Sequence, residues 1–339
     1  MDPTTHNLKS FAETIGLSPS TVSRVLNGHG DRYRISKKTQ ERVIKAAEQS
    51  GIVVNQVARG LRLQTTFTLG LVIPDISNPF FASLARQVER SARERGYSVI
   101  LADSQESTEV EVDSLRLMQS RRVDGLVIAP VGQRYTHLEA LSKSGLPMVL
   151  VDRVFDQIHA PSVCSANRQG AIDAVTELAS QGHKRIACIQ GLPESSANSE
   201  RVAGYLDGLK QAGLEQPSEY VAGDDYLSDS GKEAITKLMS LKEPPTAVLA
   251  LGNMLALGAM HALREKGLRV PNDLSIITFD DQPWSDLIDP PLTTIAQDNE
   301  ELGDTAVELL FKEMENTAET PEHRTLPTSL IRRGSVSRI

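Results

Sequence analysis

The sequence predicts an N-terminal all-α domain with a helix-turn-helix, followed by an α/β body of two lobes with parallel sheets. Three observations lead to this fold class. Short amphipathic helical patterns fill the N-terminal part of the chain. From Phe67 onward, apolar β-rich runs alternate with helical patterns, which is typical of parallel sheets covered on both faces. Basic residues are concentrated in the N-terminal part, and acidic residues dominate the remainder.

The charge is divided unevenly along the 339 residues. Residues 1–66 contain ten lysines and arginines against five aspartates and glutamates, a net charge of +5. The whole chain carries −8, so the remainder carries −13. A basic head on an acidic body is the distribution expected when only one end meets nucleic acid phosphates.

The composition restricts where the protein is expected to reside in the cell and which bound groups it is expected to need. The sequence shows no apolar run long enough to span a membrane and no recognisable signal peptide, so a cytoplasmic protein is expected. Cys164 and Cys188 are the two cysteines, which fits a reducing compartment without a disulfide framework. No Cys/His cluster has metal-ligand spacing, so neither a metal nor another cofactor is expected.

The helix-turn-helix is predicted for residues 8–27, which read LKSFAETIGLSPSTVSRVLN. Two short helices meet at Gly16, and the second opens with a Ser18 cap and Pro19 at the first helical position. The polar groups that can point away from the core are Ser20, Thr21, Ser23, Arg24 and Asn27. Such a surface suits a helix that reads the major groove, although an ordinary helical hairpin with a solvated face fits this stretch equally well.

Two further elements complete the N-terminal part. Residues 35–49 predict a third helix with Ser36 as its cap, which gives a small domain with a thin core over residues 1–52. Residues 53–66 then contain either one short helix at 55–62 or a plain linker.

Residues 67–339 predict two doubly wound lobes. The first run of strands and helices predicts strands at 67–73, 97–101, 123–129 and 147–151, with helices at 79–95, 110–119 and 137–143. The second run predicts strands at 185–190, 220–222, 247–251 and 274–279, with helices ending at 180 and spanning 200–212, 230–241 and 254–265. The tail, with a helix at 301–314, is expected to cross back and complete both lobes. The predicted lobes are about 67–163 with 293–322, and about 164–292 with 323–339.

Polar residues follow several of the predicted strands. Asn78, Asp152-Arg153, Asn253 and Asp280 come just after strand patterns, with Phe80 and Phe81 close to the first of them. Open parallel sheets bind ligands outside the carboxyl ends of their strands. Carboxylates and guanidinium groups beside aromatic rings suit a sugar or a similar polyol. Taken singly, an aspartate after a strand is more often a helix cap and Phe80-Phe81 more often core, so the prediction depends on the residues coinciding.

The sequence offers no assembled catalytic machinery. It contains no Walker phosphate loop, no GxGxxG, no GxSxG elbow and no HExxH. We therefore expect no enzyme activity and predict no catalytic residues.

At this point a family resemblance becomes apparent. The chain resembles the LacI/GalR family of transcriptional regulators over essentially its full length. The segments that carry the resemblance are SPSTVSRVLNG (18–28), VARGLR (57–62), TLGLVIPDISNPFF (68–81), RRVDGLVIAP (121–130), LVDR (150–153), GHKRIACIQG (182–191), RVAGY (201–205), LALGAM (255–260), RVPNDLSIITFDD (269–281) and PPLTTI (290–295).

The resemblance implies a homodimer that reads a near-palindromic double-stranded operator. Pro19, Ser20 and Arg24 then occupy base-reading positions, and Arg24 is chemically suited to guanine. Residues 55–62 match a hinge helix that orders on the operator, with Leu61 wedged into the minor groove. The remaining predicted DNA-binding residues are Thr21, Ser23, Asn27, Arg59 and Arg62.

The resemblance also implies a periplasmic-binding-protein-like effector domain, with an effector between the lobes. The full predicted effector set is Asn78, Phe80, Phe81, Asp152, Arg153, Arg201, Tyr226, Asn253 and Asp280. Gly252-Asn253 stands where the family usually has Asn-Asp, so the ligand cannot be copied from other members. The loop at 28–36 and the C-terminal tail resemble the fructose and sucrose repressor branch, which hints at a fructose-type or phosphorylated sugar.

The sequence therefore predicts a sequence-specific DNA-binding transcriptional repressor controlled by a small-molecule effector, a sugar or sugar phosphate. Two alternatives remain at this stage. One is a sugar-binding protein without a DNA role, and the other is an enzyme on the same α/β scaffold.

Overall fold

The computed structural model describes residues 8–26, 30–50, 65–132, 134–215, 217–315 and 320–339. The chain divides into two compact units, Met1–Phe67 and Thr68–Ile339, which we call the helical unit and the effector unit. None of the described helices is both long and apolar enough to cross a membrane.

The helical unit contains the three predicted helices, α1 (Leu8–Thr14), α2 (Pro19–Leu26) and α3 (Lys37–Gln49). The Ser18 hydroxyl accepts a hydrogen bond from the Thr21 amide at 3.1 Å, and Ser36 caps α3 in the same way. These bonds satisfy amides that the first turn of a helix leaves unpaired. The buried core of the unit is small and consists of Phe11, Ala12, Val22, Val25, Val43 and Ala47.

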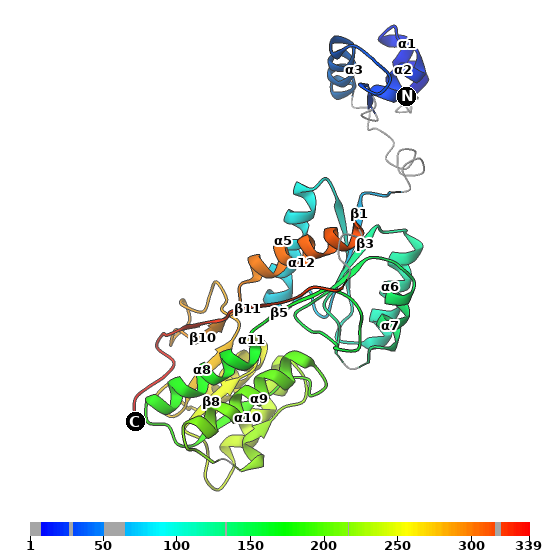
Figure 1. Cartoon of the computed structure of the whole chain (residues 1–339). Coiled ribbons are helices and arrows are strands. Elements are labelled where there is room, and N and C mark those ends of the chain that lie inside the picture. The colour runs from blue at the N-terminus through cyan, green and yellow to red at the C-terminus, as the bar shows by residue number, and fades with distance from the viewer. Residues whose placement is uncertain (1–7, 27–29, 51–64, 133, 216, 316–319) are drawn as a thin grey trace. The chain divides into compact units, whose positions relative to one another are not determined.

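The effector unit begins with a six-stranded sheet in the order β11-β5-β4-β3-β1-β2 (Figure 1). Its strands, all paired in parallel, are β1 (Thr68–Ile73), β2 (Ser98–Asp103), β3 (Gly125–Ile128), β4 (Met148–Val151), β5 (Ser162–Ser165) and β11 (His323–Leu326). The helices of this lobe are α5 (Pro79–Glu94), α6 (Thr108–Ser120), α7 (Thr136–Lys143) and α12 (Asn299–Met314). Helices α5 and α12 share one apolar cluster, and α6 and α7 share another, so the sheet is covered on both faces.

The second lobe repeats this arrangement with the order β12-β10-β9-β8-β6-β7. Its strands are β6 (Ile186–Ile189), β7 (Val221–Ala222), β8 (Ala247–Ala250), β9 (Ser275–Phe279), β10 (Thr293–Ala296) and the antiparallel β12 (Ser329–Ile331). Its helices are α8 (Asn167–Ser180), α9 (Ser196–Gln211), α10 (Ser228–Met239) and α11 (Asn253–Glu265), with a 3-10 turn η1 at Ser218–Tyr220. Residues of α8 and α9 contribute to one apolar cluster, and residues of α10 and α11 to another.

The structure corrects the predicted lobe boundaries. Strand β10 pairs with β9, so residues 293–296 belong to the second lobe and not the first. Strand β11 pairs with β5, so residues 323–326 belong to the first lobe and not the second. The lobes are therefore 68–165 with 299–326, and 166–296 with 329–339. The tail completes both lobes, as predicted, but residues 293–296 and 323–326 were assigned to the wrong lobes, because short extended segments carry no signal for which sheet they join.

Candidate functional site

Helix α2 presents the surface that the DNA-reading hypothesis requires. Val22 and Val25 are buried against the unit's core, whereas Pro19, Ser20 and Arg24 are exposed. Thr21 and Ser23 are half-buried at the edge of this face. Asn27, Arg59, Leu61 and Arg62 lie outside the described residues, so their predicted roles stay predictions.

Arg24 has a neighbour that the sequence analysis missed. Its guanidinium carbon lies 4.1 Å from the centroid of the Tyr33 ring, in the geometry of a cation–π contact. Tyr33 lies in the segment before α3, close to Asp31, whose carboxylate contacts Lys37 at 3.0 Å and Gln40 at 2.9 Å on α3. The ring therefore restricts the orientation of the arginine that is predicted to read a base. Helical spacing could not reveal this contact, because Tyr33 is not in a helix.

A second group of polar residues surrounds a small cavity between the two lobes, and we call it the inner cluster. The cavity has a volume of about 20 Å³. Its lining consists of Asn78, Phe80, Phe81, Asp152, Arg153, Ala197, Arg201, Tyr226, Asp280 and Gln297. Eight of the nine predicted effector residues thus surround one cavity, and the ninth, Asn253, bonds to Asn78. Ala197 and Gln297 are the members that the sequence analysis missed.

The topology explains why these residues meet. Asn78 follows β1, Asp152 follows β4 and Asp280 follows β9, and the carboxyl ends of the two sheets face each other. Phe80 and Phe81 serve two purposes, because both rings line the cavity and also belong to the buried core of the first lobe. The structural alternative for these two residues is therefore compatible with the functional one.

Hydrogen bonds join the lobes at the inner cluster. The Asn78 side-chain oxygen caps α5 by accepting from the Phe80 amide at 3.0 Å, and it also accepts from the Asn253 side-chain nitrogen at 3.0 Å. The Val154 amide of the first lobe donates to the Ser196 hydroxyl of the second lobe at 2.8 Å. Asp152 and Asp280 both adopt positive φ, at 66° and 72°. Non-glycine residues in this region carry a backbone cost and are often found at functional sites.

Arg153 is held in place by a carboxylate that the sequence analysis did not predict. Its two terminal nitrogens each donate to a Glu106 carboxylate oxygen at 2.7 Å, and one also donates to the Val131 carbonyl at 2.8 Å. The guanidinium lies 5.5 Å from the Phe81 ring centroid and 5.0 Å from that of Tyr226. Burial lowers the pKa of Arg153, but Glu106 outweighs this effect and the net pKa shift is upward. The charge of Arg153 is thus balanced within the protein.

Arg201 is fixed by the second lobe. Its Nε donates to the Asn167 side-chain oxygen at 2.7 Å, and a terminal nitrogen donates to the Leu251 carbonyl at 2.6 Å. The guanidinium stacks 4.1 Å from the Phe279 ring centroid. Because Arg201 is buried and held by three partners, its direction toward the cavity is set before any ligand arrives.

Asp152 is one of three residues of the inner cluster, with Tyr226 and Gln297, that have a buried polar atom without a described partner. Its side chain is only 5% exposed, yet its Oδ1 has no hydrogen-bond partner among the described residues. Burial raises the pKa of Asp152 to about 6, although Arg201 and Arg153 act in the opposite direction. A buried acceptor without a donor costs free energy, so this oxygen is suited to accept a hydrogen bond from a ligand hydroxyl.

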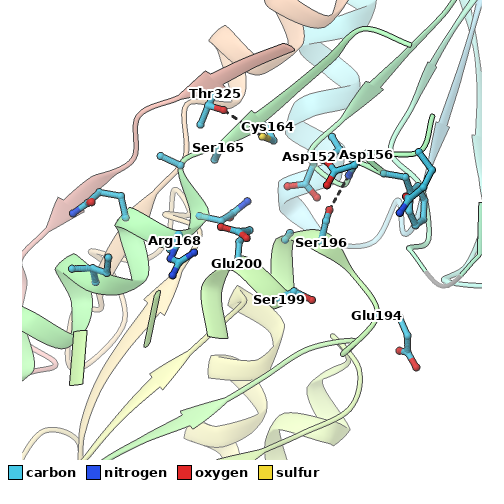
Figure 2. Close-up of a pocket in the computed structure, with 18 residues that line it drawn as sticks. Asp152, Asp156, Cys164, Ser165, Arg168, Glu194, Ser196, Ser199, Glu200 and Thr325 are labelled. Atoms are coloured by element: carbon cyan, nitrogen blue, oxygen red, sulfur yellow. Dashed lines mark hydrogen bonds between the residues drawn. The ribbon is translucent and has the colours of Figure 1, made fainter. Parts of the chain in front are cut away.

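A larger cavity adjoins the inner cluster, and we call it the outer chamber. Its volume is about 650 Å³, and it shares Asp152 and Ala197 with the inner cluster. Figure 2 shows its walls, which come from the chain after β4, the end of β5, the start of α8 and the start of α9. Asp152 lies beside Cys164 and Ser196 in this view. Asp152 is the one lining residue that the sequence predicted as a ligand contact, because the others are spread over loops, the strands β5 and β11 and the first turns of two helices, without a recognisable pattern.

Comparisons with known proteins agree with this arrangement. The family model for periplasmic binding proteins and the sugar binding domain of the LacI family matches residues 66–333. The model for bacterial regulatory proteins of the lacI family matches residues 7–55. Catabolite control protein A of Priestia megaterium is 38% identical over 304 residues, which cover 89% of this chain and 91% of the relative.

Two solved structures are similar over nearly the whole chain. The lac repressor dimer bound to operator and the anti-inducer ONPF matches with a TM-score of 0.85 and 29% identity, covering 99% of this chain and 100% of that one. The complex of the transcriptional regulator CelR with cellobiose matches with a TM-score of 0.75 and 28% identity, covering 98% and 100%.

The family models cover both units, and the relative is similar through most of the sequence. The chain belongs to the LacI family of bacterial regulatory proteins.

Proposed function

We propose that the chain is a transcriptional repressor whose affinity for a near-palindromic operator is controlled by a sugar-like polyol bound between its lobes. The observation that carries this proposal is the buried, unpartnered Oδ1 of Asp152, which lies among two guanidinium groups and aromatic rings where the two lobes meet. A hydroxyl-rich ligand supplies the donor that Asp152 lacks, and the rings cover its C–H face.

The helical unit provides the DNA contact in this proposal. Ser20 and Arg24 are exposed on α2, next to Thr21 and Ser23, which are also predicted to bind DNA. The net charge of +5 over residues 1–66 supplies the attraction to phosphate, whereas the acidic remainder is repelled by DNA. A homodimer places two such helices on the two halves of the operator.

In this proposal the two lobes regulate operator binding. The Asn78–Asn253 and Val154–Ser196 hydrogen bonds join the lobes around the inner cluster. Because the cavity of about 20 Å³ is too small for a sugar, a ligand at this position must change the separation of the lobes. A change in lobe separation then alters how the two helical units of the dimer can be spaced on the operator.

DNA binding by the full chain tests this proposal. In a gel-shift assay with genomic fragments, we expect specific binding that is lost when residues 1–66 are deleted. A thermal-shift screen of sugars then identifies ligands, because a compound that binds only the folded state raises the melting temperature. The proposal fails if no fragment is bound specifically at low salt, with or without the sugars.

The two alternative classes predict different outcomes. A sugar-binding protein without a DNA role gives thermal shifts with sugars and no specific gel shift. An enzyme on this scaffold converts the stabilising sugar, which chromatography of the incubated ligand detects. Conversion of the ligand or absence of a gel shift would therefore replace the proposal with one of these alternatives.

A further inference from the structure

The outer chamber has a distinctive charge. Four carboxylates line it, Asp152 deep in the wall and Asp156, Glu194 and Glu200 at exposed positions. Arg168 is the one lysine or arginine among its described lining residues, and it is paired with Asp207 at 2.7 Å. None of the three exposed carboxylates is in an ion pair with a described residue. The chamber therefore presents several negative charges and only one cation, which is already bound.

The wall between the chamber and the inner cluster contains an unused acceptor. Asp152 lines both cavities, is 5% exposed, and leaves Oδ1 without a partner among the described residues. Two further cations lie nearby in the inner cluster and not among the lining residues of the chamber: Arg153 is bound by both oxygens of Glu106, and Arg201 has uncharged partners. A negatively charged group in the chamber thus meets carboxylates, and Arg168, the one cation among the described lining residues, is already paired with Asp207.

The chamber is also large enough to hold a small-molecule ligand. A volume of about 650 Å³ lies within the range of about 300–1,000 Å³ that small-molecule pockets occupy. The inner cavity, with a volume of about 20 Å³, is too small for a sugar while the lobes are joined. The chamber is therefore the part of the inter-lobe region that is open to a ligand in this conformation.

We propose that the outer chamber is a second part of the ligand site, and that it receives a portion of the ligand that is uncharged or positively charged. A phosphate or carboxylate group of the ligand is excluded from the chamber. This inference depends on the proposed function and deepens it, since it names the ligand class. It also replaces the sugar phosphate that the loop at 28–36 and the C-terminal tail suggested, because a phosphate needs cations or several N–H donors around it.

Cys164 permits a test that does not require the natural ligand. It lines the chamber and is partly exposed, whereas Cys188 is fully buried and serves as an internal control. Burial raises the pKa of the Cys164 thiol, and Asp152 and Glu200 add to this effect, so the reaction is followed at pH 8.5. The probes are a cationic and an anionic methanethiosulfonate of similar size. The rate of labelling of Cys164 in the full chain is measured with each reagent, and the cationic rate is divided by the anionic rate. This ratio is then divided by the same ratio for the small thiol 2-mercaptoethanol, which corrects for the intrinsic reactivity of the two reagents.

We expect the cationic reagent to be favoured at Cys164 by about tenfold after this normalisation, at low ionic strength. The double variant Glu194→Gln/Glu200→Gln should lower the ratio at least threefold. The matched control Glu219→Gln/Glu233→Gln, which removes two exposed carboxylates that do not line the chamber, should leave it unchanged. A normalised ratio near one, an equal ratio in both double variants, or no reaction at Cys164 would each overturn the inference.

A second measurement separates this inference from the proposed function. The sugar that stabilises the protein in the thermal-shift screen should slow labelling of Cys164 by an uncharged methanethiosulfonate. Its phosphorylated form should stabilise the protein less than the sugar itself. If the sugar alters operator binding but its phosphorylated form binds more tightly, the proposed function stands and the inference about the chamber is wrong.

Discussion

The helical unit and the effector unit hold their functional side chains in opposite ways. Arg24 is exposed on α2 and stacks on the ring of Tyr33, whereas Arg153 and Arg201 are buried and fixed by several partners. The described part of the helical unit also has six buried apolar residues, against four extensive clusters in the described part of the effector unit. This difference indicates that the helical unit can adapt its side chains to DNA, whereas the effector unit holds its side chains in place before a ligand binds.

The electrostatics of the two units follow the same division. The positive charge of residues 1–66 lies in water, where phosphate contacts release counterions and screening by salt is strong. The charges of the inner cluster are buried, so each requires a partner or a shifted pKa. Substitutions of charged residues should therefore change stability more in the effector unit, and DNA recognition more in the helical unit.

The largest expected effect is the loss of the helical unit's fold. Phe11→Ala removes a 3% exposed ring from the small core and should cost about 3–5 kcal/mol, enough to unfold the unit and abolish operator binding. Leu84→Ala in α5 is the matched variant, because it removes a fully buried side chain from the larger core of the first lobe.

We expect Leu84→Ala to lower the melting temperature of the effector unit without unfolding it, and to leave the helices of the other unit intact. Circular dichroism melts and a gel shift measure both outcomes. Operator binding that survives Phe11→Ala would contradict the contrast between a thin and an extensive core.

Next in size is the effect of Asp152 on stability. Its pKa is raised by burial to about 6, from an ordinary value of 3.8. A carboxyl group whose pKa is higher in the folded state binds its proton more tightly there. Its ionisation therefore lowers the free energy of unfolding above about pH 6, and this cost disappears as the pH falls toward 4.

Asp152→Asn should thus stabilise the effector unit by about 1–3 kcal/mol at pH 7.5, and by less at pH 4.5. Urea unfolding at the two pH values measures the change. The exposed Asp156→Asn is the control and should change stability by less than about 0.5 kcal/mol. Equal stabilisation at both pH values would show that ionisation of Asp152 does not lower the free energy of unfolding.

Loss of base reading by Arg24 should have an effect similar to or smaller than that of Asp152→Asn. It should change the free energy of operator binding and not the free energy of unfolding. Arg24→Ala should weaken operator binding by about 1–3 kcal/mol and relax the preference at one operator position. The measurement is fluorescence anisotropy with a set of singly substituted operators. Lys45→Ala, an exposed cation on α3, is the control and should leave the sequence preference unchanged. A uniform loss of affinity for every sequence after Arg24→Ala would contradict base reading.

The smallest expected effect concerns the contact between the lobes. Asn78→Ala and Asn253→Ala each remove one side of the 3.0 Å hydrogen bond that joins them. A double-mutant cycle in urea unfolding should give a coupling of about 0.5–1.5 kcal/mol. If the two substitutions are additive within error, this bond does not hold the lobes together.

The sequence was sufficient to predict the architecture and most of the inner cluster. Strand patterns before Asn78, Asp152 and Asp280 determined where these residues would lie, because parallel strands end at one edge of a sheet. The buried face of α2 could likewise be predicted from helical spacing, since Val22 and Val25 are one turn apart.

Other features depended on pairing between distant segments. Glu106 lies 47 residues from Arg153, and no local pattern indicates that the two form an ion pair. The outer chamber is formed by chain after β4, the end of β5 and the first turns of two helices, so it has no signature in any single segment. The assignment of β10 and β11 to their sheets is also a matter of tertiary pairing, which is why the predicted lobe boundaries were wrong.

The central claim is that a ligand between the lobes controls DNA binding by the helical unit. The most direct measurement is the operator dissociation constant of the full chain with and without the stabilising sugar, for the natural protein and for Arg201→Ala, at one salt concentration. A melting curve and ligand-free operator binding confirm that the variant is folded. The account predicts that the sugar changes the constant of the natural protein by about 5- to 150-fold and leaves that of the variant unchanged. An equal change in both proteins, or no change in either, would contradict it.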